Sequence, residues 1–156
     1  MSKPRRAQIC FLTPFPSARS TTLGRILPAI DRAVDWSRFV PVIEDKVDYP
    51  RPGAGRRPWS FDIMARITFV QWLSGLNDRQ AEELLIDAPV VVDFVGLDPA
   101  LPKPPDSETI GAFRRRLRRF GQDEAIVEGV LQQLAEKGVT LLPGSHADPR
   151  WSGPDL

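Results

Sequence analysis

The sequence predicts an all-α protein: a compact multi-helix domain that is helix-turn-helix-like, with disordered N- and C-terminal tails. Three observations lead to this fold class. Apolar residues recur at helical spacing through most of positions 21–138. Residues that start or stop helices stand at nearly every break between these segments. The hydrophobic fraction is 42% in 156 residues, which is enough for one domain with its own core.

The composition divides the chain into a helical domain and its flanks. Residues 1–20 are rich in Pro, Ser and Arg, and they are expected to form a flexible N-terminal segment. Within the helical domain, residues 49–58 hold three prolines, two glycines and three arginines and are predicted to be a linker. Residues 139–156 are rich in turn residues and are predicted to be an irregular tail, with a strand at 139–142 as an open alternative.

Two helices are expected before the linker. Residues 22–34 show i, i+3, i+4 apolar spacing, and Pro28 inside this segment is expected to kink or split it. Asp35 is a suitable N-cap for a second helix that runs through Val47. Pro41 indicates that this second helix is short or bent.

The longest helix is predicted from Ser60, as its N-cap, to Ser74. It is apolar nearly all round, which is typical of a central, buried helix, and Gly75 is expected to end it. Asn77 and Gln80 then have the spacing of a capping box at the start of the next helix, which Pro89 is expected to end.

Three segments complete the predicted helical domain. Residues 90–95 form either a short helix or a buried strand, because so short an apolar run has no decisive period. Asp106 is expected to cap an arginine-rich helix that Gly121 ends, and Asp123 to cap a last helix that ends at Gly138. The residues predicted to share one core are Ile67, Val70, Leu84, Phe113 and Leu117.

The arginine-rich helix has two different sides on a helical wheel. Its apolar arc consists of Ile110, Phe113, Leu117 and Phe120. Its candidate DNA-binding residues are Arg114, Arg115, Arg116, Arg118 and Arg119. Arg115 and Arg119 lie nearly opposite the apolar arc, as a helix that enters the major groove requires. A solvated basic face, paired with Glu82, Glu83 or Glu128, explains the same pattern equally well.

The linker is a second basic element, and Arg56 and Arg57 are candidate DNA contacts within it, beside Arg51. An extended basic segment next to a helical domain can follow a phosphate backbone or a minor groove. A flexible linker with solubilising charge is the alternative. Trp59 and Trp72 are expected to belong to the core rather than to stack on bases.

No set of side chains in the sequence predicts catalysis, a cofactor or a metal site. A single histidine, His146, and a single cysteine, Cys10, exclude a disulfide within the chain and a cysteine-based metal cluster. Phosphate-loop, G-x-S-x-G and CxxC motifs do not occur, so no small-molecule substrate is expected. No apolar run is long enough to span a bilayer, and Pro14 and Pro16 interrupt the apolar start, which predicts a cytoplasmic protein.

A series of segments in the order IDRAVDW, GRRPWSFDIMARITFVQWLSGLND, AEELLIDAPVVVDFVGLD, PDSETIGAFRRRLRRFG and LAEKGV resembles the N-terminal domain of InsH-type bacterial insertion-sequence transposases of the DDE class. The resemblance covers residues 30–138. It implies a helical module that recognises double-stranded DNA at element ends, in the bacterial cytoplasm.

In such transposases the helical module precedes a ribonuclease-H-like catalytic domain. Asp148 falls where the family has its first catalytic aspartate, but His146 and Pro149 interrupt the family pattern around it, and the match is poor. With no position for the second aspartate and the glutamate, the expectation is a truncated transposase without catalysis. Association with itself or with a full-length transposase is a further expectation. The alternatives are an interaction module in which the long apolar helix pairs with another chain, and a remnant without function.

Overall fold

The computed structural model describes residues 22–51, 58–144 and 150–152. The expectations for residues 1–20, for Arg56, Arg57 and Asp148, and for much of the C-terminal tail lie outside the described residues. The elements are α2 (Thr22–Ala33), the 3₁₀ helix η2 (Trp36–Arg38), α3 (Val40–Lys46), α4 (Phe61–Ser74), α5 (Asp78–Asp87), α6 (Pro89–Val95), α7 (Ser107–Arg119), α8 (Ala125–Glu136), β1 (Thr140–Leu142) and β2 (Arg150–Ser152). The described part is mostly helical, which confirms the predicted fold class.

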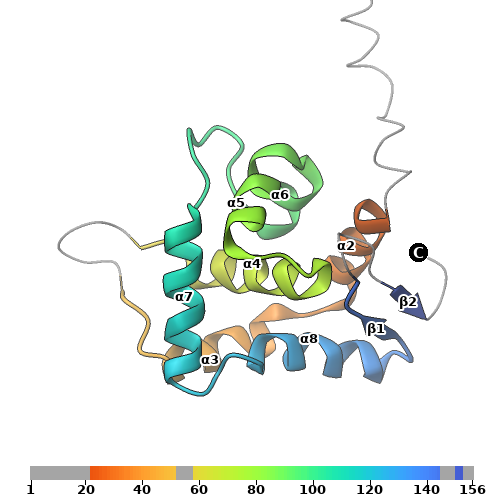
Figure 1. Ribbon diagram of the computed structural model, residues 1–156. Helices are drawn as coiled ribbons and strands as arrows, with labels where there is room; N and C mark the ends of the chain where they lie inside the picture. The colour runs from red at the N-terminus through yellow and green to blue at the C-terminus, as the bar shows by residue number, and fades with distance from the viewer. Residues whose placement is uncertain (1–21, 52–57, 145–149, 153–156) are drawn as a thin grey trace, which may run out of the picture.

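Helix α4 is the centre of the fold, as predicted. It runs across the middle of the molecule, with α5 and α6 on one side of it, α3 and α8 on the other, and α7 standing across one end (Figure 1). Buried residues occur on every side of α4, including Phe69 and Leu73, which are fully buried. Gly75 ends the helix in the left-handed conformation that glycine adopts without steric cost, with φ at 63°.

The region before the linker differs in detail from its prediction. Helix α2 continues through Pro28, but the single helix expected from Asp35 to Val47 is divided into η2 and α3. Asp35 does act as an N-cap, with its side chain accepting a hydrogen bond from the Ser37 amide. The division has a physical reason: Pro41 lacks an amide proton and fits the first turn of a new helix better than the interior of a continuous one.

Helices α5 and α6 resolve the ambiguity at residues 90–95. The capping box at the start of α5 is present, with both the Asn77 and the Gln80 side chains bonded to the backbone of the other residue. Pro89 follows the end of α5 and also occupies the first turn of α6, so residues 90–95 are helical. The proline therefore starts a helix, in addition to separating it from the one before.

The C-terminal elements contain two departures from the prediction. Helix α8 begins at Ala125 with Glu124 as its N-cap and no side-chain cap, so the assignment of Asp123 as the cap is wrong. The segment predicted to be an irregular tail holds two strands, β1 and β2, which pair antiparallel with Leu141 opposite Trp151. The open alternative of a strand at 139–142 is therefore confirmed.

The helices enclose one hydrophobic core. Of the five residues expected to share it, Ile67, Val70, Phe113 and Leu117 are buried there and Leu84 packs against it partly buried. Phe120, the last residue of the apolar arc, is 38% exposed at the C-terminal end of α7 and does not belong to this core. In the part of the chain that the structure describes, no helix has the length and apolar character needed to cross a membrane.

Candidate nucleic-acid interface

Helix α7 is fixed to the core along one side. Asp106 accepts a hydrogen bond from the Thr109 amide and caps the helix, as predicted. Phe113 is 5% exposed and packs its ring against Tyr49 and Phe61, with ring centroids 5.8 Å and 5.2 Å away. Leu117 is buried one turn further on. These contacts set the rotation of the helix and thereby decide which arginines face outward.

Two of the five arginines are held by the protein itself. Nη1 of Arg114 donates to Oδ1 of Asp78 at 2.8 Å, and the two groups form an ion pair between α7 and α5. Nε of Arg116 donates to the carbonyl of Val47 at 3.0 Å, and its Nη2 donates to the carbonyl of Asp48. Arg116 therefore satisfies carbonyls at the C-terminal end of α3 and joins that end to α7.

The other three arginines, Arg115, Arg118 and Arg119, are exposed. The guanidinium carbon of Arg119 lies 5.7 Å from the ring centroid of Phe120, within the range of a cation–π contact. We call these three residues the outer arginines. They are the most exposed arginines of α7.

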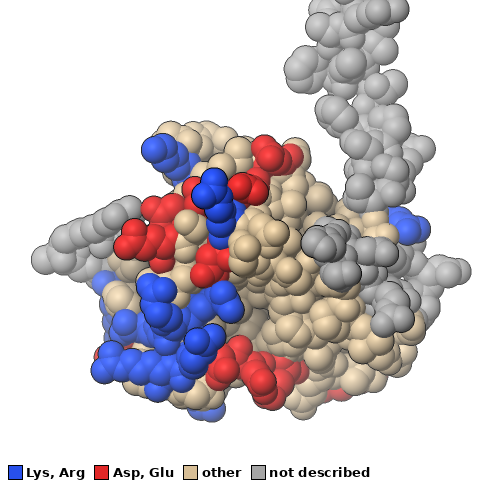
Figure 2. Space-filling view, in the orientation of Figure 1, with Lys and Arg blue, Asp and Glu red and all other residues tan. Residues whose placement is uncertain are grey.

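The charges around α7 are sorted along the helix. Blue atoms of lysine and arginine gather at the lower left of the molecule, around the C-terminal half of α7, and red atoms border them above and to the right (Figure 2). Acidic residues also occupy the first turns of α5 and α7, namely Asp78 and Glu108. The basic surface is therefore local, in keeping with a net charge of only +1 for the whole chain.

The acidic residue that pairs with an arginine of α7 differs from those that the sequence suggested. Glu82 accepts a hydrogen bond from the Ser107 amide at the start of α7, and Glu83 pairs with Arg79. Among the described residues, no ion pair joins Glu128 to an arginine of α7, and the arginine partner is Asp78 instead. No sequence signal identified this residue, because it lies 36 positions before Arg114 and is brought to it only by the packing of α5 on α7.

Two ionisable groups near α7 have shifted pKa values. Partial burial by itself would raise the pKa of Asp78, but hydrogen bonds from Gln71 and Arg114, with the charges of Arg114 and Arg115, bring it below the ordinary value. Burial raises the pKa of Tyr49, with the Glu44 charge acting in the same direction and Arg116 opposing them. Asp78 is thus held as a carboxylate beside the arginine helix.

The remaining predicted residues fall into three groups. Trp59 and Trp72 are half-buried against the core, as expected for core residues. Arg51, at the edge of the linker, is exposed, whereas Arg56, Arg57 and Asp148 lie outside the described residues. Among the residues that are described, no three His, Cys, Asp or Glu side chains come together in a way that would hold a metal ion.

A hollow of about 580 Å³ lies beside α5 and α6, and two core residues, Leu85 and Leu97, contribute to its lining. It is formed by α6, the end of α5 and the proline-rich loop after α6. Its lining includes Ile86 and Leu101, which are 63% and 45% exposed and are among the most exposed large apolar side chains of the described residues. Exposed apolar side chains grouped at a hollow are typical of interaction surfaces in proteins.

Comparison with known proteins places the chain in a family. Residues 17–116, more than half of the chain, match the family described as "Transposase domain (DUF772)". The match spans α2 to α6 and most of α7. No solved structure matches the chain.

Proposed function

The chain belongs to the transposase domain family DUF772, and on this premise we propose that it binds duplex DNA through the outer arginines of α7. One observation supports the proposal most strongly. The inner side of α7 is committed to the core through Phe113 and Leu117, while Arg115, Arg118 and Arg119 on its other sides are exposed. A helix with this division can enter a major groove without loss of its packing.

The chemistry of arginine fits the proposed ligand. A guanidinium group offers five donors in a planar fork that matches phosphate oxygens and the major-groove edge of guanine. The three outer arginines can contact the backbone or the bases, depending on the depth at which α7 enters the groove. Arg51, Arg56 and Arg57 of the linker are proposed to add contacts to the phosphate backbone.

The finer proposal is that the DNA consists of the ends of a mobile element. It rests on the resemblance to InsH-type transposases of the DDE class, whose N-terminal domain recognises element ends. In this proposal the chain binds the ends without catalysing a step itself, and it competes or associates with a full-length transposase. Incubation of the protein and bound DNA with Mg²⁺ or Mn²⁺ should therefore yield no cleaved strand; metal-dependent cleavage would contradict this part of the proposal.

The decisive experiment for DNA binding is a pair of matched double variants. The test variant is Arg115→Ala with Arg119→Ala, and the control is Arg25→Ala with Arg32→Ala, which removes the same charge from exposed positions on α2. The probe is a duplex that the parent protein enriches from a random pool, beside a shuffled duplex of equal composition. A sequence from the ends of the element that encodes the chain should match the enriched duplex.

The expected result follows from counterion release. Each lost phosphate contact should reduce the slope of log affinity against log salt by about 0.9, and each lost base contact should cost about 1–3 kcal/mol of binding to the enriched duplex. The control double variant should keep nearly the full affinity. If the test variant binds the enriched duplex with the affinity and salt slope of the control, the outer arginines are only solvated surface.

A second candidate function is protein–protein interaction, through a different surface from the one that the sequence suggested. The long apolar helix that was expected to pair with another chain is α4, and α4 is buried in its own core. The exposed side chains of Ile86 and Leu101 at the hollow beside α6 favour that surface instead. Self-association through it predicts a mass that rises with concentration on a sizing column, and Ile86→Glu should abolish this rise.

A further inference from the structure

Asp78 connects the buried centre of the protein to the arginine helix. It is the first residue of α5, and its Oδ1 accepts hydrogen bonds from Nε2 of Gln71 on α4 and from Nη1 of Arg114 on α7, both at 2.8 Å. Gln71 is 4% exposed, so it anchors the carboxylate from inside the core. The orientation of Arg114 is therefore tied to a fixed point of the fold.

A second arginine also faces this carboxylate. Gly111 lies on the side of α7 that faces Asp78, and a Cβ atom at this position would lie 3.0 Å from Oδ2 of Asp78 and 3.2 Å from Nη1 of Arg115. The two charged groups are therefore at most about 6 Å apart, a distance at which opposite charges interact. Glycine leaves the space that allows both groups to approach across the same turn of the helix.

We propose that Asp78 is a positioning residue that sets the DNA specificity of this interface: it orients Arg114 and Arg115 toward base edges and weakens their binding to phosphates. The inference rests on the proposed function and goes beyond it by assigning a selective role to an acidic residue. It also separates two kinds of arginine. Arg114 forms an ion pair with Asp78 and Arg115 lies within about 6 Å of it, whereas Arg118 and Arg119 form no ion pair among the described residues.

The orienting effect follows from the donor geometry of arginine. Asp78 takes one donor of Arg114, and the remaining donors of the same rigid fork stay available for a pair of acceptors such as O6 and N7 of guanine. A side chain that is already held loses less conformational freedom when it binds. Contact with the correct base is thereby favoured.

Asp78 favours the base contact but weakens the binding of phosphates. Phosphate contacts supply the part of binding that is independent of sequence, and a carboxylate beside two arginines opposes that part by like-charge repulsion. Binding to any duplex is weakened, whereas the base contact of an oriented arginine is retained. Specificity is the difference between these two affinities, so the carboxylate increases it.

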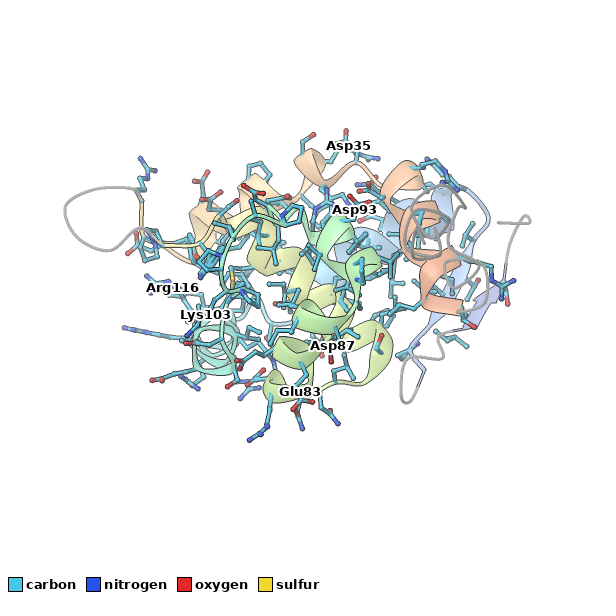
Figure 3. All side chains as sticks on the ribbon, turned by 90° about the horizontal axis from the view of Figure 1, so that it is seen from above. Asp35, Glu83, Asp87, Asp93, Lys103 and Arg116 are labelled. Carbon is cyan, nitrogen blue, oxygen red and sulfur yellow. The ribbon has the colours of Figure 1, made fainter. Side chains whose placement is uncertain are left out.

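The test compares Asp78→Asn with Asp87→Asn, which makes the same chemical change at the other end of α5 (Figure 3 labels Asp87). The measured quantity is the ratio of affinities for the enriched and the shuffled duplex. For Asp78→Asn the ratio should fall about tenfold, the size of one good base contact, while the affinity for the shuffled duplex and its salt slope rise. Asp87→Asn should leave the ratio as in the parent.

Gly111→Ala is a second variant that keeps every charge. Alanine favours the helix over glycine, and its methyl group would require the side chains of Asp78 and Arg115 to shift away from it by a few tenths of an ångström. The ratio of affinities for the enriched and the shuffled duplex should fall in this variant too. If Asp78→Asn does not fold, Gly111→Ala alone tests the role of Asp78.

The outcomes separate this inference from the proposed function. If the parent discriminates between the duplexes and both variants retain its ratio, the role of Asp78 is overturned while DNA binding by α7 stands. If the parent binds neither duplex, the proposed function fails, and this inference fails with it.

Discussion

Helices α4 and α7 are almost equal in length, 14 and 13 residues, but they use their surfaces in opposite ways. Helix α4 has buried residues on all sides and contacts α3, α5, α6, α7 and α8. Helix α7 buries one side and turns exposed arginines outward. The comparison teaches that a polar face on a helix at the edge of the core is available for function, whereas the centre of the fold is fully used for stability.

The largest effect on stability is expected on the buried side of α7, which packs in the core as α4 does. Phe113→Ala should lower the free energy of unfolding by about 3–5 kcal/mol, because it removes a buried ring packed against Tyr49 and Phe61. Phe120→Ala, on the same helix but 38% exposed, should stay within about 1 kcal/mol of the parent. Urea unfolding followed by circular dichroism measures both. Equal losses would mean that burial of Phe113 contributes no more to stability than the exposed ring of Phe120.

Most of the helix ends could be predicted from the sequence, because the signals that set them are local. Gly75, the capping box of Asn77 and Gln80, and the Asp106 cap all act within one turn of the helix that they delimit, and each is present. Asp123 failed as a cap because α8 begins two residues later, at a start without a side-chain cap. Caps are preferences of about 1 kcal/mol, which packing elsewhere can outweigh.

The candidate site was less predictable, because its geometry depends on contacts between distant segments. The helical wheel separated the arginines from Phe113 and Leu117, but it did not show that Phe120, in the same apolar arc, is exposed at the C-terminal end of α7. Nothing in the sequence near α7 indicates that Arg114 meets Asp78 or that Arg116 meets the carbonyls after α3. Those partners depend on how α3 and α5 pack beside α7.

The next largest effect on stability is expected at the N-caps of α7 and α4. Asp106→Ala should cost about 1 kcal/mol of stability, because the Thr109 amide loses its hydrogen-bond acceptor at the start of α7. Ser60→Ala is the matched change at the start of α4, where the serine makes no side-chain cap hydrogen bond, and it should cost less than about 0.5 kcal/mol. Urea midpoints compare the pair. A larger loss at Ser60 would show that α4 depends on its cap more than α7 does.

A smaller effect should appear in acid, at the contact between α5 and α7. The pKa of Asp78 is lower in the folded protein than its ordinary value of 3.8, so the ionised carboxylate stabilises the fold above that value. This contribution is lost as the pH falls through the folded pKa. The stability difference between the parent and Asp78→Asn should therefore have its full size above about pH 5 and shrink as the pH falls below 3.8 in unfolding experiments. A difference that stays constant with pH would exclude the carboxylate charge as its source.

The smallest effect on stability is expected on the outer side of α7. Arg115→Ala with Arg119→Ala should change the free energy of unfolding by no more than about 0.5 kcal/mol, since both side chains are exposed and alanine favours the helix at least as well as arginine. Alanine at these positions should stabilise the helix slightly. Loss of the positive charge of Arg119 from the last turn should lower the stability slightly, because cations there interact favourably with the helix dipole. Urea unfolding of the double variant beside the parent measures the sum. A loss above about 1 kcal/mol would mean that the outer arginines support the fold, and a loss of DNA binding in the same variant would then no longer identify them as the contact surface.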